Sequence, residues 1–248
     1  MDEEIEKLNI ELFLNLPIGG LGSKESIRKA FSYLKDLPAI PHILDIGCST
    51  GLKTIELAKI SKGQIIAIDI IQAYLDKLKK NAKASGVADQ IEALNKSMSS
   101  MDFDDGTFDV IWCDMAIFFY GFEKGLKEWR RFLKKGGYMV LSELVWLNDN
   151  PPDEVKKHWD DEYPLMKKNE ENIVIIKNLQ YKLIDSFILN EEDCWNCYTL
   201  LEKSIVELRE KYATNPKILE FLEINHREID IFKKYSEYYG FAFYIMQN

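Results

Sequence analysis

Short apolar runs and amphipathic stretches alternate through the middle of this chain. Five apolar runs have the length of buried strands: residues 42–46, 64–68, 91–94, 108–113 and 138–141, of which 64–68 is rich in β-branched residues. Three stretches between them repeat apolar side chains at helical spacing: residues 51–61, 70–85 and 122–135. Strands joined by helical crossovers predict a parallel sheet covered on both faces, the doubly wound α/β arrangement, in which ligands bind at the carboxyl ends of the strands.

The flanking segments add helices and extend the sheet. Residues 1–37 predict two helices separated by the glycine-containing stretch 17–23, with Ser23 as the N-cap of the second helix. That stretch is either a flexible lid over a bound ligand or an interhelix turn. Further helices are expected at residues 152–162, 165–179, 199–212 and 216–239, and further strands at 182–189 and 241–246. The sheet is therefore expected to have seven strands, most of them parallel.

The first predicted strand runs into a glycine-containing turn and then a helix, Ile43-Leu-Asp-Ile-Gly-Cys-Ser-Thr-Gly51. Glycine lets backbone approach a ligand, and the free amides at a helix start favour a polar or anionic group. Asp69 ends the second strand, where a carboxylate can bind two ribose hydroxyls or cap the next helix. Ser49 stands where a dinucleotide fingerprint has its middle glycine. The pattern favours a nucleoside site over a pyrophosphate site.

This turn resembles the first motif of class I S-adenosylmethionine-dependent methyltransferases, whose usual form is close to L-D-I-G-C-G-T-G. The similarity continues through Asp69, the segment 103–112 and the segment 129–142, in the order and spacing of that family. Within the family, the chain is most similar to the subgroup near the ubiquinone and menaquinone C-methyltransferases and uncharacterised bacterial methyltransferases. The resemblance implies a Rossmann-like methyltransferase fold and S-adenosyl-L-methionine as methyl donor, released as S-adenosyl-L-homocysteine.

The resemblance also implies which residues bind the cofactor: Asp45, Gly47, Cys48, Ser49, Gly51, Asp69, Ile70, Ser97, Met98 and Asp114. The turn would line the methionine part, Asp69 would bind the ribose, and Ile70 would pack on the adenine. Ser97 departs from the family pattern, because that position often carries an acid for the adenine amine. Asp114 would lie near the sulfonium and the acceptor.

Three parts are expected within one structural domain. Residues 1–37 would form N-terminal helices and a possible cofactor lid, and residues 38–145 the S-adenosylmethionine-binding core. Residues 146–248 would form helical cap insertions and the last two strands of the sheet. Aromatic residues in the cap could line an apolar pocket for a small organic acceptor, or they could be ordinary core.

Methyl transfer from a sulfonium is an in-line displacement, for which the protein mainly supplies alignment and exclusion of water. A base is needed only when the acceptor must lose a proton. The candidate catalytic residues are Asp114, Glu143 and His158, and His226 is a weaker one. Two alternatives stay open: a non-catalytic S-adenosylmethionine-binding or scaffold protein, and another transferase, such as an aminopropyl transferase.

Composition and charge narrow the choice of partner. The chain has 248 residues, 46% of them hydrophobic, and a formal net charge of −9, which argues against disorder and against binding nucleic acid through bulk charge. Residues 1–142 carry 20 acids and 19 bases, and residues 143–248 carry 21 acids and 13 bases. The acidic cap is either a solvated surface or a site that favours a neutral or cationic small acceptor.

The remaining signals concern location and cysteine chemistry. The start of the chain is acidic and no apolar run approaches the ~18 residues of a membrane span, so a cytoplasmic protein without such a span is expected. Cys194 and Cys197 have C-x-x-C spacing, which suits a redox pair, half a zinc site or two small apolar residues, and we expect no metal. An arsenite-methylating site would require these two cysteines to meet Cys113 in one pocket.

Overall fold

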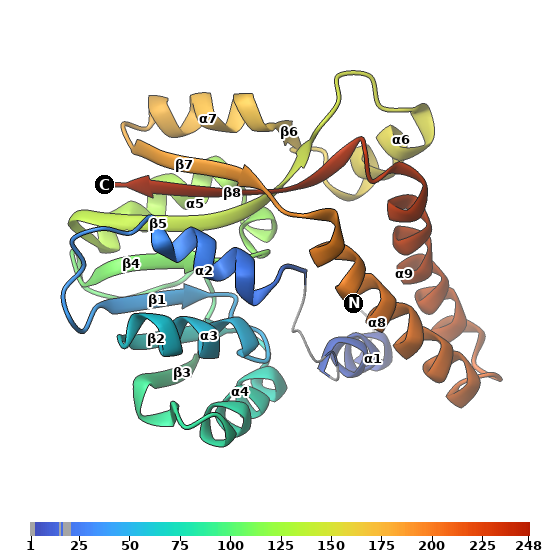
Figure 1. The fold of residues 1–248 in the computed structure, drawn as a ribbon. Coiled ribbons are helices and arrows are strands. Elements are labelled where there is room, and N and C mark those ends of the chain that lie inside the picture. The colour runs from blue at the N-terminus through green and yellow to red at the C-terminus, as the bar shows by residue number, and fades with distance from the viewer. Residues whose placement is uncertain (1–2, 15, 17–20) are drawn as a thin grey trace.

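The computed structural model describes residues 3–14, 16 and 21–248, and its centre is one mixed sheet (Figure 1). The strands are β1 (His42–Ile46), β2 (Gln64–Asp69), β3 (Ile91–Asn95), β4 (Phe108–Cys113), β5 (Leu133–Trp146), β6 (Lys167–Lys168), β7 (Lys182–Ile188) and β8 (Tyr239–Gln247). Their order is β3-β2-β1-β4-β5-β8-β7, with β6 paired to β5. Only β8 pairs antiparallel, with β5 and β7. The predicted doubly wound, mostly parallel fold is confirmed, and the two-residue β6 is an addition.

Helices cover both faces of this sheet, and some lie beyond the carboxyl ends of its parallel strands. They are α1 (Glu3–Leu14), α2 (Lys24–Ser32), α3 (Leu52–Ser61), α4 (Gln72–Ala84), α5 (Phe122–Trp129), α6 (Asp153–Glu162), α7 (Asn169–Asn178), α8 (Glu191–Lys211) and α9 (Pro216–Tyr235), with short 3-10 turns at 88–90, 117–119 and 130–132. The apolar sides of α2, α3 and α4 pack on one face of the sheet, and those of α5 and α7 pack on the other. Figure 1 shows α1, α8 and α9 beyond the carboxyl ends of the parallel strands.

Several element boundaries differ from the sequence pattern, among them the starts of β5, α7 and α8 and the end of β5. Strand β5 begins at Leu133, although residues 130–135 have a helical pattern. Residues 130–132 form only a 3-10 turn, Leu133 pairs with Phe108 of β4, and continuous pairing with β4 and β8 starts at Tyr138. Helix α8 begins at Glu191, eight residues earlier than the periodicity predicts. Asn190 caps it through a hydrogen bond from the Glu192 amide (3.1 Å), and acidic residues fill the first turn, where they stabilise the helix dipole.

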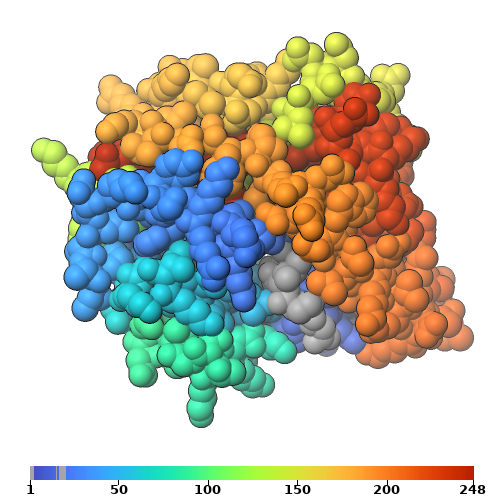
Figure 2. Space-filling model, viewed as in Figure 1, coloured from blue at the N-terminus to red at the C-terminus, as the bar shows by residue number. Residues whose placement is uncertain are grey.

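The N-terminal part of the chain packs against the cap. Ser23 is the N-cap of α2, as predicted, and it forms a reciprocal pair of hydrogen bonds with Ser26 (3.0 and 3.1 Å). Figure 2 shows the surface of α8, in orange, meeting that of α2, in blue. The possible lid falls partly outside the described residues, because residues 17–20 are not described. Within the described part of the chain, no helix has the length and apolar content needed to cross a membrane.

Candidate functional site

The turn after β1 is held against the end of β2. The amides of Gly47 and Cys48 both donate to the carbonyl of Ile68 (2.9 and 3.0 Å), and the turn uses left-handed backbone at Gly47, Ser49 and Gly51 (φ 75°, 50° and 78°). Left-handed backbone favours glycine, so Ser49 is the unusual residue of the three.

The two glycines are needed for packing inside the protein. A Cβ on Gly47 would lie 2.5 Å from the Cβ of Ala116, and one on Gly51 would lie 2.2 Å from Cγ of Leu78 in α4. The turn therefore fits closely between α4 and the segment after β4. Glycine was expected here because it lets backbone approach a ligand, and the structure adds that neighbouring side chains leave no room for a Cβ.

Asp69 joins this turn to the start of the next helix. Its Oδ2 accepts from the Ser49 amide and its Oδ1 from the Ile71 amide, both at 2.9 Å. Burial raises the pKa of Asp69. A carboxylate has about four lone-pair positions, so Asp69 can accept further hydrogen bonds from a ligand. Beside it, the Ile70 side chain is 66% exposed, which leaves a large apolar surface next to the carboxylate.

Asp45 lies in β1, two residues before the glycine turn, and is 4% exposed. Its Oδ2 accepts a hydrogen bond from Oγ1 of Thr54 (2.6 Å), which connects β1 to α3. Burial raises the pKa of Asp45 to about 7, although the hydrogen bond from Thr54 acts in the opposite direction. Asp45 therefore links the strand before the turn to the helix after it.

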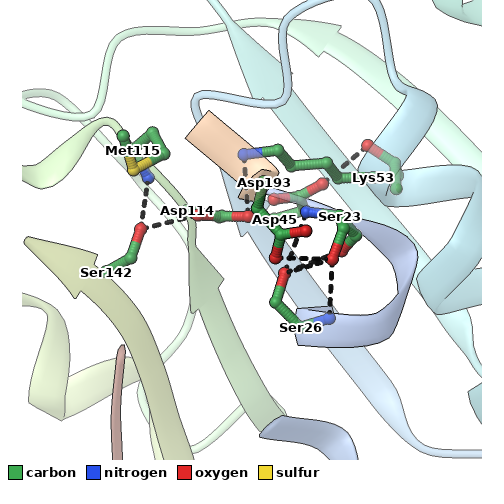
Figure 3. A network of polar contacts seen from close by, with 9 residues as sticks. Ser23, Ser26, Asp45, Lys53, Asp114, Met115, Ser142 and Asp193 are labelled. Atoms are coloured by element: carbon green, nitrogen blue, oxygen red, sulfur yellow. Dashed lines mark hydrogen bonds and ion pairs between the residues drawn. The ribbon is translucent and has the colours of Figure 1, made fainter. Parts of the chain in front are cut away.

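Asp114 is part of a buried polar network, shown in Figure 3. Its Oδ2 lies 2.8 Å from Nζ of Lys53, in the first turn of α3, and its Oδ1 accepts from Oγ of Ser142 (2.6 Å). The amide of Met115 donates to the same serine oxygen (2.8 Å). The network joins the end of β4 and Ser142 within β5 to the helix that follows the glycine turn. Sequence reasoning missed Lys53 and Ser142, although Lys53 stands only two residues after the second glycine.

The segment before α2 reaches the same network. The hydroxyl of Ser23 donates to Oδ2 of Asp193, in the first turn of α8 (2.8 Å). A Cβ on Gly22 would lie 3.7 Å from Nζ of Lys53 and 4.0 Å from Oδ2 of Asp114. The N-terminal segment and the cap therefore meet beside the Lys53–Asp114 pair.

The loop after β3 contributes the expected Ser97 and Met98. The Ser97 and Ser99 hydroxyl oxygens are 2.8 Å apart, so Ser97 is engaged within its own loop. The carbonyl of Met98 accepts from Nε1 of Trp129 (3.2 Å), and its Cε lies 4.0 Å from the Cβ that Gly47 would carry. Met98 is thereby fixed next to the glycine turn. Cys48, inside the turn, is buried, and burial raises the pKa of its thiol.

The other two candidate catalytic residues lie elsewhere. Glu143 follows Ser142 in β5 and therefore points to the opposite face of the sheet, because strand side chains alternate. His158 is in α6, where burial lowers its pKa and where the charges acting on it belong to Glu162, Arg227 and Asp161. Of the three candidates, the structure brings only Asp114 to the glycine turn. His226, the weaker one, lies on α9 beside Asp230 (3.3 Å).

The cysteines do not form one site. Cys113 belongs to the apolar cluster on the α5 side of the sheet, whereas Cys194 and Cys197 belong to the cluster on the other side. Burial raises the pKa of both helix cysteines to about 12. The arsenite-type arrangement, which requires three thiols in one pocket, is therefore not what the fold builds. Among the described residues, no group of three or more His, Cys, Asp or Glu side chains could hold a metal ion.

Comparison with known proteins agrees with this geometry. Residues 43–137 match a family model described as a methyltransferase domain. Over 121 residues the chain is 32% identical to a demethylmenaquinone methyltransferase of Bacteroides fragilis, covering 48% of this chain and 49% of that protein. The chain thus spans about half the length of the curated relatives it matches.

Two solved structures are similar along nearly the whole chain. An S-adenosylmethionine-dependent methyltransferase from Geobacter sulfurreducens, in complex with S-adenosyl-L-homocysteine, has a TM-score of 0.84 at 18% identity and covers 96% of this chain and 97% of its own. The structure of an S-adenosylmethionine-dependent methyltransferase from Thiobacillus denitrificans, also in complex with S-adenosyl-L-homocysteine, has a TM-score of 0.83 at 17% identity. The similarity covers 97% of each chain. Residues 43–137 thus match a methyltransferase domain, and the chain as a whole has the fold of these two S-adenosylmethionine-dependent methyltransferases.

Proposed function

We propose that the protein transfers a methyl group from S-adenosylmethionine to a small-molecule acceptor. The observation that carries the proposal is the arrangement at the end of β2, where Asp69 holds the Ser49 amide (2.9 Å) and Ile70 remains 66% exposed. A carboxylate with free lone pairs beside an exposed apolar side chain suits a nucleoside, which has both hydroxyls and a flat base. The methyltransferase domain match covers these residues.

The residues present fit this cofactor. Asp69 would bind the ribose hydroxyls, Ile70 would pack against the adenine, and Ser97 and Met98 would border the base. Gly51 caps α3 without a side-chain hydrogen bond in the described part of the chain, so the first amides of α3 are available to the methionine carboxylate. When bound, the cofactor supplies a methyl group activated by its sulfonium.

The rest of the chemistry is alignment and exclusion of water. The carboxylate of Asp114 would lie near the cationic end of the cofactor, and Lys53 and Ser142 hold its orientation. The hydrogen bond from Ser23 to Asp193 joins the N-terminal segment to α8 on one side of the site, and this contact would help to exclude water. The acidic cap favours a neutral or cationic acceptor, because residues 143–248 contain 21 acidic and 13 basic residues.

Cofactor binding is tested by titrating S-adenosyl-L-homocysteine into the protein in a calorimeter. We expect saturable binding by the wild type and a loss of about tenfold or more for Ile70→Ser, because the apolar contact with the base is removed. Ile70 is largely exposed, so this substitution leaves the fold intact. The matched control is Ile40→Ser, which is 58% exposed and precedes β1 at the opposite end of the sheet.

Absence of binding by the wild type, or equal binding by Ile70→Ser, would contradict the proposal. Turnover is tested by incubating the protein with S-adenosylmethionine and neutral, cationic or anionic acceptors and measuring the S-adenosylhomocysteine released. Preferred turnover of anionic acceptors would overturn the role given to the acidic cap.

A further inference from the structure

Lys53 is a largely buried cation beside the glycine turn. It is the second residue of α3, and its side chain is only 15% exposed. Among the residues labelled in Figure 3 it is the one cation, and three carboxylates lie around it, those of Asp45, Asp114 and Asp193. A buried charge is costly unless it is paired, and replacing a buried ion pair by apolar side chains is often neutral or stabilising. Fold stability alone is therefore a weak reason for a lysine at this position.

The contact between Lys53 and Asp114 is an ion pair without a well-formed hydrogen bond. Nζ and Oδ2 lie 2.8 Å apart, yet Oδ2 is buried and has no partner at hydrogen-bonding geometry among the described residues. Oδ1, by contrast, accepts from Oγ of Ser142 (2.6 Å). Lys53 has three donors, and the described part of the chain offers it no other ion-pair partner. Both charged groups can therefore exchange partners while Ser142 keeps Asp114 in place.

The other two carboxylates of this network already have hydroxyl partners. Asp45 accepts from Oγ1 of Thr54 (2.6 Å), and Asp193 accepts from Oγ of Ser23 (2.8 Å). A ligand that engaged either of them would compete with an existing hydrogen bond. A ligand that engaged the ion pair would not, so the ion pair is the part of the network best suited to a charged ligand.

We propose that Lys53 binds the carboxylate of the methionine part of the cofactor, in exchange for Asp114, and that Asp114 then takes the ammonium group. This inference rests on the proposed function, because it concerns the same cofactor site. The first amides of α3 favour an anion, and Lys53 belongs to that turn, so the helix start and the lysine act on one carboxylate. The exchange breaks one ion pair and forms two, which leaves no charge unpaired.

Three ligands separate the charges of the methionine part. S-adenosyl-L-homocysteine carries both the carboxylate and the ammonium group, its decarboxylated form lacks only the carboxylate, and methylthioadenosine lacks both. We expect the wild type to bind the decarboxylated ligand about tenfold or more weakly than S-adenosyl-L-homocysteine, because the charge-assisted hydrogen bond to Lys53 is missing. Equal binding of these two ligands in a calorimeter would overturn the inference.

Two variants that break the same ion pair test which group recognises the carboxylate. Lys53→Met removes the cation and should abolish the tenfold preference for S-adenosyl-L-homocysteine over its decarboxylated form. Asp114→Asn leaves Lys53 free for the carboxylate, so it should keep that preference at the wild-type level or above. A preference that survives in Lys53→Met, or an equal loss in both variants, contradicts the assignment.

The matched control is Lys59→Met, the same change of charge at an exposed position in the last turn of α3, which should keep the wild-type preference. Loss of the preference in this control would also overturn the inference. Binding of methylthioadenosine by each variant establishes that it is folded with an intact nucleoside site.

The wild-type titration keeps this inference distinguishable from the proposed function. If the wild type fails to bind S-adenosyl-L-homocysteine, the proposed function is contradicted, and this inference with it. If the wild type binds it and Lys53→Met shows the same preference as the wild type, this inference alone is contradicted.

Discussion

At the scale of single residues, left-handed backbone has different consequences in different places. Gly51 and Gly86 have similar positive φ angles, 78° and 71°. A Cβ on Gly51 would lie 2.2 Å from Leu78, whereas a Cβ on Gly86 would have nothing within 4 Å. The two positions therefore separate the conformational requirement for glycine from the steric one.

We predict that Gly86→Ala lowers the free energy of unfolding by about 1 kcal/mol, the cost of left-handed backbone in a residue with a Cβ. Gly51→Ala should lower it by at least about 3 kcal/mol, because Leu78 must also move away from the turn. Urea denaturation of both variants measures the difference. Equal losses would show that the contact between the turn and α4 is not tight.

At the scale of elements, one hydrogen bond connects the start of α2 with the start of α8. The Ser23 hydroxyl both accepts from the Ser26 amide (3.1 Å) and donates to Asp193 (2.8 Å). The same side chain thus caps a helix on the sheet and attaches the cap helix beside the Lys53–Asp114 pair. This double role makes the N-terminal segment and α8 depend on each other.

Ser23→Ala should cost about 1–2 kcal/mol of stability through the lost N-cap, and it should also speed amide exchange in the first turns of α8. Asp193→Ala should speed exchange in the same turns of α8 while the α2 cap stays in place. Ser32→Ala is the control, because that hydroxyl is exposed and donates to the Lys29 carbonyl within its own helix. Hydrogen exchange confined to α2 in Ser23→Ala would contradict the link.

At the scale of the whole molecule, buried carboxyls couple folding to pH. Burial raises the pKa of Glu143 to about 8 from an ordinary value of 4.5. Between these two values the folded state holds a proton that the unfolded state has lost, so stability falls as pH rises through this window. Ionisable groups in the elements around Glu143 are Cys113, Glu123, Lys124, Lys127, Glu128, Tyr163, Lys167, Glu170 and Tyr244.

We predict that Glu143→Gln flattens this dependence. Relative to the wild type, the variant should gain at least about 1.4 kcal/mol of stability on going from pH 5 to pH 8, the equivalent of one pKa unit. Glu220→Gln, an exposed change on α9, should follow the wild-type curve. Urea denaturation at several pH values measures both. A Glu143→Gln curve parallel to that of the wild type would show that this carboxyl is charged in the folded protein.

Much of the fold follows from local sequence signals. Hydrophobic periodicity predicted the seven main strands and their crossover helices, because each element has one apolar face or two. The capping role of Ser23 and the glycine turn were also predictable, since both depend on neighbours only a few residues away. The end of α5 and the start of β5 were not, because residues 130–132 continue the helix only as a 3-10 turn and Leu133 then pairs with Phe108 of β4, a partner outside the local sequence.

The candidate site likewise has a part that local sequence predicts and a part that tertiary contacts decide. The sequence by itself determined the glycine-containing turn from residue 47 to 51 and the position of Asp69 and its apolar neighbour Ile70 at the end of the second strand. Only the tertiary structure decided that Ser142 joins Asp114 and Lys53, while Glu143, one residue later, faces a separate pocket on the other side of the sheet. The reason is physical: neighbours in a strand point to opposite faces, and the partner each one meets comes from an element far away in the chain.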